Sequence, residues 1–282
     1  MIYIPDAYLD QLLLEDIQYG DVTTRALGIG QGEGEITFFH RQGGCVSGMP
    51  VAERLLQRLG LRVTHCVQDG DCVQPGEAML AATGKVAALH QGWKVTQNVL
   101  EWCCGVSEYL HHMKAIYTRE VPSGQIACTR KIIPGTKLLS ILAVLAGGGI
   151  VHRLGCAETV LLFTNHRRFL PNQDDWAAHV AQLRHAAPEK AIIVEVDHPD
   201  EAMIALSAEP DILQLDKFTP EQVSATLSYA ARHAPACKVS AAGGINLQTV
   251  QRYAETGVSL LVTSAPYHAP SADIRVVLTP IR

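Results

Sequence analysis

Short apolar runs alternate with longer helical patterns throughout the second half of the chain, and this alternation constrains the fold more than any other feature. The apolar runs, which we expect to be strands, are residues 125–128, 158–163, 191–196, 211–215, 238–241 and 259–263. The intervening segments with helical spacing of apolar residues are 136–146, 174–186, 199–207, 219–233 and 246–256. Strands that alternate with helices of about 10–15 residues build parallel βαβ units, and almost continuously apolar strands are buried on both faces. Because no dinucleotide-binding fingerprint is present, we expect an α/β barrel of about six parallel strands, closed or incomplete, rather than an open sheet.

The first half of the chain shows a different pattern of predicted elements, in which short strands and turns precede a long helix. Residues 32–89 hold short apolar runs separated by turns, and residues 91–117 carry apolar side chains at helical spacing. The last apolar segment, 274–278, is expected to be a strand that returns to the first sheet. The predicted domains are an N-terminal α+β sheet domain, residues 1–107 with the returning segment 269–282, and the C-terminal barrel, residues 108–268.

Composition narrows the class of protein. The chain has 282 residues, of which 48% are hydrophobic and 18% charged, as expected of a globular protein large enough for two cores. Its net charge of −5 argues against nucleic acid as a partner.

The eight cysteines form no Cys-x-x-Cys motif and are expected to be small core residues or reduced thiols. No apolar run approaches the roughly 18 residues of a membrane span, and the N-terminus does not resemble a signal peptide. We therefore expect a cytoplasmic protein with no membrane partner.

Two cationic pairs stand in the glycine-rich stretch of residues 129–166. Arg130 and Lys131 directly follow one predicted strand, and His152 and Arg153 precede the next. One interpretation is that these are solvated loop cations. The other is a site for a polyanionic small molecule, because buried strands seldom end in unneutralised cations and the planar fork of arginine matches carboxylate and phosphate. We favour the second interpretation because both pairs fall within one α/β unit.

The carboxyl ends of the other predicted strands supply carboxylates and a glycine pair. In α/β barrels the working residues lie at these ends. Glu195 and Asp216 either cap the helices that follow or take part in a substrate site. Gly243 and Gly244 precede the predicted helix 246–256. They form either an ordinary turn or a phosphate site that uses backbone N–H groups and the helix dipole.

The stretch that begins at Thr129 carries a signature that resembles the quinolinate phosphoribosyltransferases, also called nicotinate-nucleotide pyrophosphorylases. The matching motifs are Thr129-Arg130-Lys131, Pro134-Gly135, Gly147-Gly148-Gly149, His152-Arg153-Leu154-Gly155 and Asn165-His166. The likeness covers nearly the whole chain. Several departures make it most similar to the ModD branch of this family, the pyrophosphorylases named for molybdenum-transport operons.

The resemblance implies phosphoribosyl transfer, in which a ring nitrogen attacks the anomeric carbon of phosphoribosyl pyrophosphate and pyrophosphate leaves. By its position in the family pattern, Lys131 is implied to meet the pyrophosphate. Glu195 and Asp216 are implied to hold ribose hydroxyls and Mg²⁺, which is the expected cofactor. The other implied site residues are Arg130, His152 and Arg153 for the carboxylated pyridine, and Ala242, Gly243, Gly244 and Ser264 for the ribosyl phosphate.

Four positions depart from the family pattern. Ala242 replaces a serine and Ser264 replaces a glycine, so the phosphate cup is expected in modified form. Lys94 replaces an arginine that reaches into the barrel of a partner subunit, which implies a homodimer or higher homo-oligomer with shared active sites. Phe163 replaces a lysine of the acceptor pocket, unless strand alternation turns this side chain into the core.

These departures leave the acceptor open. We expect a pentosyltransferase of the nicotinate-nucleotide diphosphorylase type that acts on a carboxylated pyridine-like heterocycle and uses quinolinate poorly. One alternative is a true carboxylating quinolinate phosphoribosyltransferase of NAD synthesis. Another is a molybdenum-linked protein that binds a metabolite or an oxyanion without catalysis.

Overall fold

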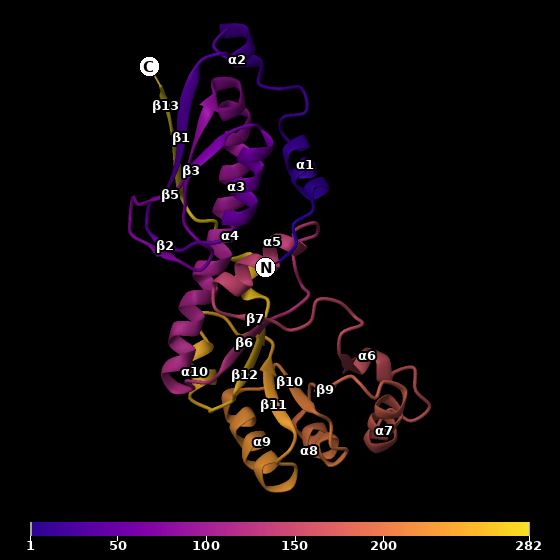
Figure 1. The fold of residues 1–282 in the computed structure, drawn as a ribbon. Coiled ribbons are helices and arrows are strands. Elements are labelled where there is room, and N and C mark those ends of the chain that lie inside the picture. The colour runs from indigo at the N-terminus through magenta and orange to yellow at the C-terminus, as the bar shows by residue number, and fades with distance from the viewer. Residues whose placement is uncertain (1, 282) are drawn as a thin grey trace. The chain divides into compact units, whose positions relative to one another are not determined.

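The computed structural model describes residues 2–281, and the chain divides into two compact units (Figure 1). The first unit comprises the chain up to His111, the segment Ile132–Gly148 and the chain from Pro266 onward. The second unit comprises His112–Lys131 and Gly149–Ala265. Compact packing units need not coincide with domains, so the domain boundary near residue 107 stays a prediction.

The first unit is built on an antiparallel sheet with the strand order β13-β1-β5-β3. Its strands are β1 (Glu33–His40), β3 (Arg62–Cys66), β5 (Ala78–Lys85) and β13 (Ile274–Pro280). A second small sheet pairs β2 (Gly44–Cys45) with β4 (Cys72–Val73). The helices of this unit are α1 (Asp6–Leu14), α2 (Val22–Leu27), α3 (Met49–Arg58), α5 (Lys137–Ala146) and the first part of α4 (Val86–Glu120). Because β13 pairs with β1, the prediction that the last apolar segment returns to the first sheet is confirmed.

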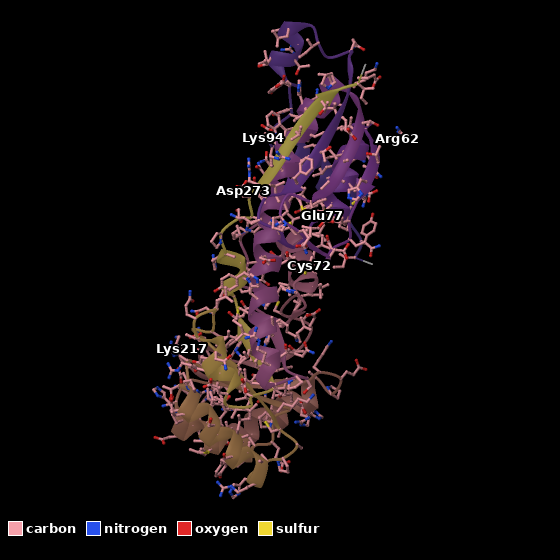
Figure 2. All side chains as sticks on the ribbon, turned by 90° about the vertical axis from the view of Figure 1, so that its left-hand side faces the viewer. Arg62, Cys72, Glu77, Lys94, Lys217 and Asp273 are labelled. Atoms are coloured by element: carbon pink, nitrogen blue, oxygen red, sulfur yellow. The ribbon has the colours of Figure 1, made fainter. Side chains whose placement is uncertain are left out.

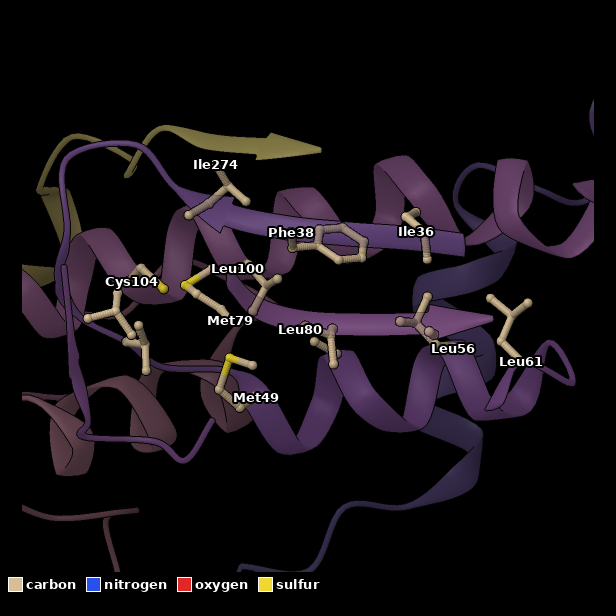
Figure 3. Packing of buried hydrophobic residues seen from close by; sticks show 14 of the residues in the cluster. Ile36, Phe38, Met49, Leu56, Leu61, Met79, Leu80, Leu100, Cys104 and Ile274 are labelled. Carbon is tan, nitrogen blue, oxygen red and sulfur yellow. The ribbon is translucent and has the colours of Figure 1, made fainter. Parts of the chain in front are cut away.

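The core of the first unit joins segments that are far apart in the sequence. Burial alternates along β1, where Ile36 and Phe38 are fully buried, because successive side chains of a strand point to opposite faces. Figure 3 shows these two residues packed with Leu56 of α3, Leu100 of α4 and Ile274 at the start of β13. Each such buried side chain contributes about 1.5–3 kcal/mol to folding, so the C-terminal strand is an integral part of this unit.

Seven parallel strands form the sheet of the second unit, in the order β7-β6-β12-β11-β10-β9-β8. They are β6 (Gln125–Cys128), β7 (Ile150–Val151), β8 (Val160–Leu162), β9 (Ile192–Val196), β10 (Ile212–Asp216), β11 (Lys238–Ala242) and β12 (Leu260–Thr263). The helices are α6 (Thr164–Arg167), α7 (Trp176–Ala186), α8 (Pro199–Ser207), α9 (Pro220–His233) and α10 (Val250–Ala254), and the 3-10 helix η1 (Ala265–His268) follows β12. The edge strands β7 and β8 are not paired with each other within residues 2–281, so the barrel is incomplete. The predicted fold class, a sheet domain followed by an α/β barrel, is confirmed.

Several elements of the second unit differ from the prediction, which did not include the short helices α6 and η1. β7 adds a seventh strand, because the two residues Ile150–Val151 are too few to show a strand pattern in the sequence. α10 begins at Val250 rather than at residue 246. The side chain of Asn246 accepts the N–H of Gln248 at 2.9 Å, and the hydroxyl of Thr249 accepts the N–H of Asn246 at 3.0 Å. Such local side-chain bonds compete with helix formation, which explains the late start.

The helix α4 contributes to both units. Its 35 residues bury Leu100 in the core of the first unit and Tyr117 in the second, where the Tyr117 hydroxyl donates to the backbone oxygen of Val258 at 2.5 Å. Polar and charged residues interrupt its apolar face. Within residues 2–281, no helix combines the length and the apolar character needed to cross a lipid bilayer.

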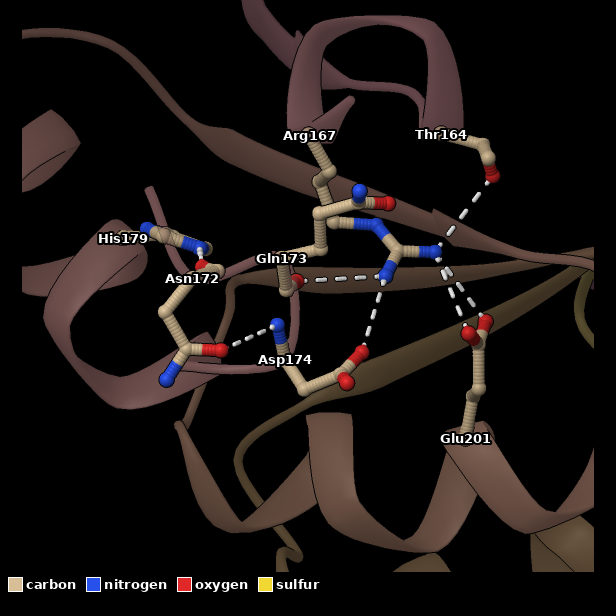
Figure 4. Close-up of polar contacts among 7 residues, drawn as sticks. All are labelled: Thr164, Arg167, Asn172, Gln173, Asp174, His179 and Glu201. Atoms are coloured by element: carbon tan, nitrogen blue, oxygen red, sulfur yellow. Dashed lines mark hydrogen bonds and ion pairs between the residues drawn. The ribbon is translucent and has the colours of Figure 1, made fainter. Parts of the chain in front are cut away.

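A buried guanidinium ties α6 to its neighbours in the second unit. The side chain of Arg167 is only 3% exposed, and its Nη2 atom lies 3.1 and 3.3 Å from the two carboxylate oxygens of Glu201 on α8 (Figure 4). Its Nη1 donates to the backbone oxygen of Gln173 at 3.3 Å, and the guanidinium lies 4.0 Å from the ring centroid of Trp176. Arg167 therefore holds the α6–α7 connection against α8.

Candidate active site

A cavity of about 590 Å³ opens at the carboxyl ends of the seven parallel strands, and every residue that lines it belongs to the second unit. Its lining residues are Thr129, Arg130, Lys131, His152, Arg153, Leu161, Phe163, Glu195, Gln214, Asp216, Lys217, Ala242, Gly243, Gly244, Ile245, Asn246, Val262, Thr263, Ser264 and Ala265. Parallel strands deliver their carboxyl ends to one edge, so residues that are far apart in the sequence meet there. The structure thus brings together all of the predicted site residues except Lys94.

Lys94 lies on the part of α4 that belongs to the first unit (Figure 2). Its ammonium group donates to the side-chain oxygen of Gln97 at 3.0 Å and lies 4.7 Å from the ring centroid of Trp93. The cavity is built from the second unit alone, so a role for Lys94 in a neighbouring subunit stays a prediction.

A hydrogen-bonded chain of three side chains runs along one side of the cavity. His152 Nε2 lies 3.0 Å from the side-chain oxygen of Gln214, and the Gln214 amide donates to a Glu195 carboxylate oxygen at 2.6 Å. Gln214 and Glu195 are register partners on the neighbouring strands β10 and β9, which places their side chains side by side. Gln214 is only 4% exposed and was not predicted. The sequence could have indicated this residue, because Gln214 is polar, stands two positions before Asp216 and interrupts an otherwise apolar run.

The surroundings shift the acid–base equilibria of this chain. Burial raises the pKa of Glu195, and the nearby carboxylate of Asp216 raises it further, while the hydrogen bond from Gln214 acts in the opposite direction. Burial lowers the pKa of His152, and the neighbouring cations Arg153 and Arg130 add to this effect. The environment therefore favours a neutral imidazole, and Gln214 supports the ionised form of Glu195.

The cations of the cavity differ in their exposure. Arg130 and Lys131 are exposed, whereas Arg153 is only 8% exposed. Burial lowers the pKa of Arg153, and Arg130 contributes by charge repulsion. Buried cations generally have an anionic or aromatic partner, and Arg153 lies over the ring of Phe163. The side chain of Phe163 therefore faces the cavity, which resolves the alternative left open by the sequence.

The glycine pair allows two loops to approach closely. A side-chain carbon at Gly243 would lie 2.7 Å from a carboxylate oxygen of Asp216 and 2.6 Å from Cγ of Lys217, and the φ angle of Gly243 is +82°. Lys217 itself has a φ of 61°, and its N–H donates to the backbone oxygen of Ala242 at 2.7 Å. Its ammonium lies 3.5 Å from Asp216, so Lys217 is a further cavity cation that the prediction did not include.

The helix that was expected to follow the glycine pair starts only at Val250. The predicted contribution of its dipole at Gly243 and Gly244 is therefore wrong, because this field falls off within the first turn. Binding of a phosphate by the backbone of the turn and by Ser264, which also lines the cavity, stays a prediction.

Comparison with known proteins agrees with this arrangement. Residues 21–104 match the family described as "Quinolinate phosphoribosyl transferase, N-terminal domain", and residues 106–277 match "Quinolinate phosphoribosyl transferase, C-terminal domain". The chain is 55% identical over 280 residues to "Putative pyrophosphorylase ModD" of Escherichia coli O157:H7, and 45% identical over 278 residues to the protein of that name from Pasteurella multocida, with 99% of each chain covered. Its fold is similar to that of the nicotinate-nucleotide pyrophosphorylase from Francisella tularensis, with a TM-score of 0.89 at 23% identity and 98% of both chains covered.

Proposed function

Because the chain belongs to the quinolinate phosphoribosyltransferase family and is an enzyme of the pentosyltransferase type, we propose that it is a phosphoribosyltransferase. It transfers ribose phosphate from phosphoribosyl pyrophosphate to the ring nitrogen of a carboxylated, pyridine-like heterocycle. The nitrogen lone pair forms the new bond to the anomeric carbon. The bond from that carbon to the pyrophosphate oxygen breaks, and its electron pair leaves with pyrophosphate. A neutral pyridine nitrogen carries no proton, so this step needs no general base.

The observation that carries the proposal is the arrangement of charge in one cavity. Three of its cations, Arg130, Lys131 and Lys217, face the same space as the carboxylates Glu195 and Asp216. Phosphoribosyl pyrophosphate combines anionic phosphates, which match the cations, with ribose hydroxyls, which match the carboxylates. In this assignment Lys131 stabilises the charge that develops on the leaving pyrophosphate, and a positioned cation acts most strongly in such a partly closed site.

Mg²⁺ is the cofactor of the proposed reaction, and the residues present fit it. Glu195 and Asp216 offer hard oxygen ligands from the ends of neighbouring strands, β9 and β10, and both line the cavity. Their mutual repulsion, seen in the effect of Asp216 on the pKa of Glu195, is the kind that a divalent cation relieves. When bound, Mg²⁺ would neutralise charge on the phosphates of the donor substrate.

The acceptor is proposed to be held by Arg130, His152 and Arg153 against the ring of Phe163. The guanidinium groups of Arg130 and Arg153 suit a carboxylate, and the rings of His152 and Phe163 offer faces for a flat heterocycle. The lysine of the family pattern is absent at position 163. Quinolinate, with two carboxylates, is therefore proposed to be a poor substrate, and an acceptor with less negative charge a better one.

Pyrophosphate release provides the direct test. The full-length protein is incubated with phosphoribosyl pyrophosphate, Mg²⁺ and a panel of pyridine carboxylic acids that includes quinolinate and nicotinate. We expect release that depends on both Mg²⁺ and at least one acceptor, and a nucleotide product identified by mass spectrometry. Binding of phosphoribosyl pyrophosphate without release for any acceptor would instead indicate the non-catalytic metabolite-binding protein.

Assembly is part of the proposal. If Lys94 enters the cavity of a partner subunit, activity requires at least a homodimer. Activity per chain should then fall on dilution together with the dimer fraction measured by analytical ultracentrifugation, and Lys94→Ala should lower it. A monomer that stays fully active would remove Lys94 from the site and leave the proposed chemistry unaffected.

A further inference from the structure

Three potential metal ligands gather in the first unit, which contains none of the residues that line the cavity. Cys45 on β2 and Cys72 on β4 are direct partners in the antiparallel register, and His111 lies on α4. The two sulfur atoms and a ring nitrogen of His111 all lie within 4.8 Å of one another, and Cys72 Sγ is 4.0 Å from His111 Nε2. Both cysteines are free thiols, Cys45 being buried and Cys72, labelled in Figure 2, exposed.

The backbone of Cys45 is fixed to α4 on both sides. Its N–H donates to the carboxylate of Glu108, and its carbonyl oxygen accepts a hydrogen bond from the Ser107 hydroxyl at 2.6 Å. Glu108 and His111 are three residues apart on α4 and so share one face of the helix. The contacts that hold Cys45 in place therefore come from the same helix that presents the histidine. Ligands that are positioned by surrounding hydrogen bonds are typical of protein metal sites.

The pairing of β2 with β4 places the two thiols on one side. The neighbouring N–H of Val46 donates to the backbone oxygen of Asp71 at 2.9 Å, whereas the N–H of Cys45 donates to the side-chain carboxylate of Glu108. Cys45 and Cys72 thus occupy a non-hydrogen-bonded position of the ladder, where opposing side chains approach most closely. Two sulfurs from this ladder and one imidazole from α4 make a three-point cluster assembled from distant segments.

We propose that Cys45, Cys72 and His111 bind one Zn²⁺ ion, with a fourth position open to water at the exposed edge next to Cys72. Zinc prefers thiolate and imidazole ligands, and distances of about 2.3 Å to sulfur and 2.0–2.1 Å to nitrogen place tetrahedral ligand atoms roughly 3.5–3.8 Å apart. The observed separations require only a small inward movement, which the exposed side chain of Cys72 is free to make. On binding, each thiol releases its proton to solvent and the sulfur lone pair forms the bond to the metal.

This site is chemically distinct from the proposed magnesium site. Soft sulfur ligands select zinc, whereas the carboxylates of the cavity select Mg²⁺. The metal would join the β2–β4 sheet to α4.

Metal titration of the full-length protein tests the proposal. The protein is stripped with a chelator, kept reduced with a phosphine, and titrated with Co²⁺ and then with Zn²⁺ in competition with a chromophoric chelator. We expect one ion per chain, with the visible absorption of tetrahedral cobalt and a sulfur-to-cobalt charge-transfer band. Cys72→Ser and His111→Gln should each weaken zinc binding at least as much as loss of an outer-shell partner does, about tenfold to a hundredfold.

Matched controls separate this site from adventitious binding. Cys156 is an exposed cysteine outside the cluster, and His112 is the exposed residue next to His111 on α4. Cys156→Ser and His112→Gln should bind zinc as the wild type does. The proposal is overturned if the reduced wild type takes up no zinc, or if the cluster variants bind it with unchanged affinity. It is equally overturned if Cys45 and Cys72 are recovered as a disulfide and the reduced pair shows no cobalt spectrum.

Discussion

The guanidinium carbon of Arg153 lies 5.6 Å from the centroid of the Phe163 ring, and both side chains line the cavity of the second unit. A cation over an aromatic face is stabilised by about 0.5–2 kcal/mol, depending on desolvation, and Arg153 is almost completely buried. Phe163 therefore does two things at once. It supports the buried guanidinium, and it stands at the position where the resemblance to the family leads us to expect a lysine.

The first prediction concerns this position. Phe163→Lys should raise kcat/KM for quinolinate by about tenfold to a hundredfold, because a charge-assisted hydrogen bond to a carboxylate contributes about 1.5–3 kcal/mol and each 1.4 kcal/mol is tenfold. Wild-type kcat/KM with quinolinate should stay below about 10⁴ M⁻¹s⁻¹, the low end of typical enzymes. Phe169 is 91% exposed, so Phe169→Lys is the matched control and should change nothing. An efficient wild type would identify quinolinate as the substrate.

The second prediction concerns the carboxylates of the cavity. Asp216→Asn and Glu195→Gln should each lower kcat on the order of a hundredfold, because each removes one positioned charge from the site. Circular dichroism and urea unfolding should show that both variants fold. Asp197 is exposed and directly follows the strand β9, which carries Glu195, so Asp197→Asn serves as the control with near-normal turnover. Near-normal turnover in both cavity variants would remove these carboxylates from the mechanism.

The third prediction uses the pH dependence of the reaction. Burial raises the pKa of Glu195 while the hydrogen bond from Gln214 lowers it, so removal of that donor should raise the pKa further. In Gln214→Met the acidic limb of the kcat/KM profile should therefore move to higher pH, because Glu195 takes up its proton sooner as the pH falls. Gln182→Met, on exposed α7 surface, should leave the limb in place. An unshifted limb in Gln214→Met would mean that Glu195 ionisation does not limit the reaction.

The fourth prediction concerns stability and Arg167. Arg167→Met leaves Glu201 without its partner and removes the cation from the Trp176 face. Loss of one partner of a buried ion pair costs about 3–5 kcal/mol, and the partial exposure of Glu201, 27%, favours the lower end of this range. Urea unfolding should detect the loss. The free energy of unfolding of Arg168→Met, at the exposed neighbouring position, should stay within about 0.5 kcal/mol of the wild-type value. Equal stability of the two variants would show that the contacts of Arg167 with Glu201 and Trp176 do not stabilise the second unit.

The residues at the strand ends could be predicted from the sequence, because the positions of the strands follow from the local pattern of apolar residues. Once the alternation of apolar runs and helices indicated parallel strands, Lys131, Glu195 and Asp216 were placed at one edge, since all parallel strands present their carboxyl ends there. The short helix α10 could not be read in the same way. Its late start depends on hydrogen bonds between Asn246 and Thr249, which override the apolar spacing.

The sequence by itself determined the class of fold, the family and the set of strand-end residues, because periodicity and motif spacing are properties of neighbouring positions. Only the tertiary structure decided that Phe163 faces the cavity, that Gln214 joins His152 to Glu195, and that Cys45 and Cys72 meet His111. The reason is physical. A strand's side chains alternate between two faces, and a shift of one residue exchanges them. Which face is buried, and which distant segment packs against it, is fixed only when the sheet register and the surrounding helices are in place.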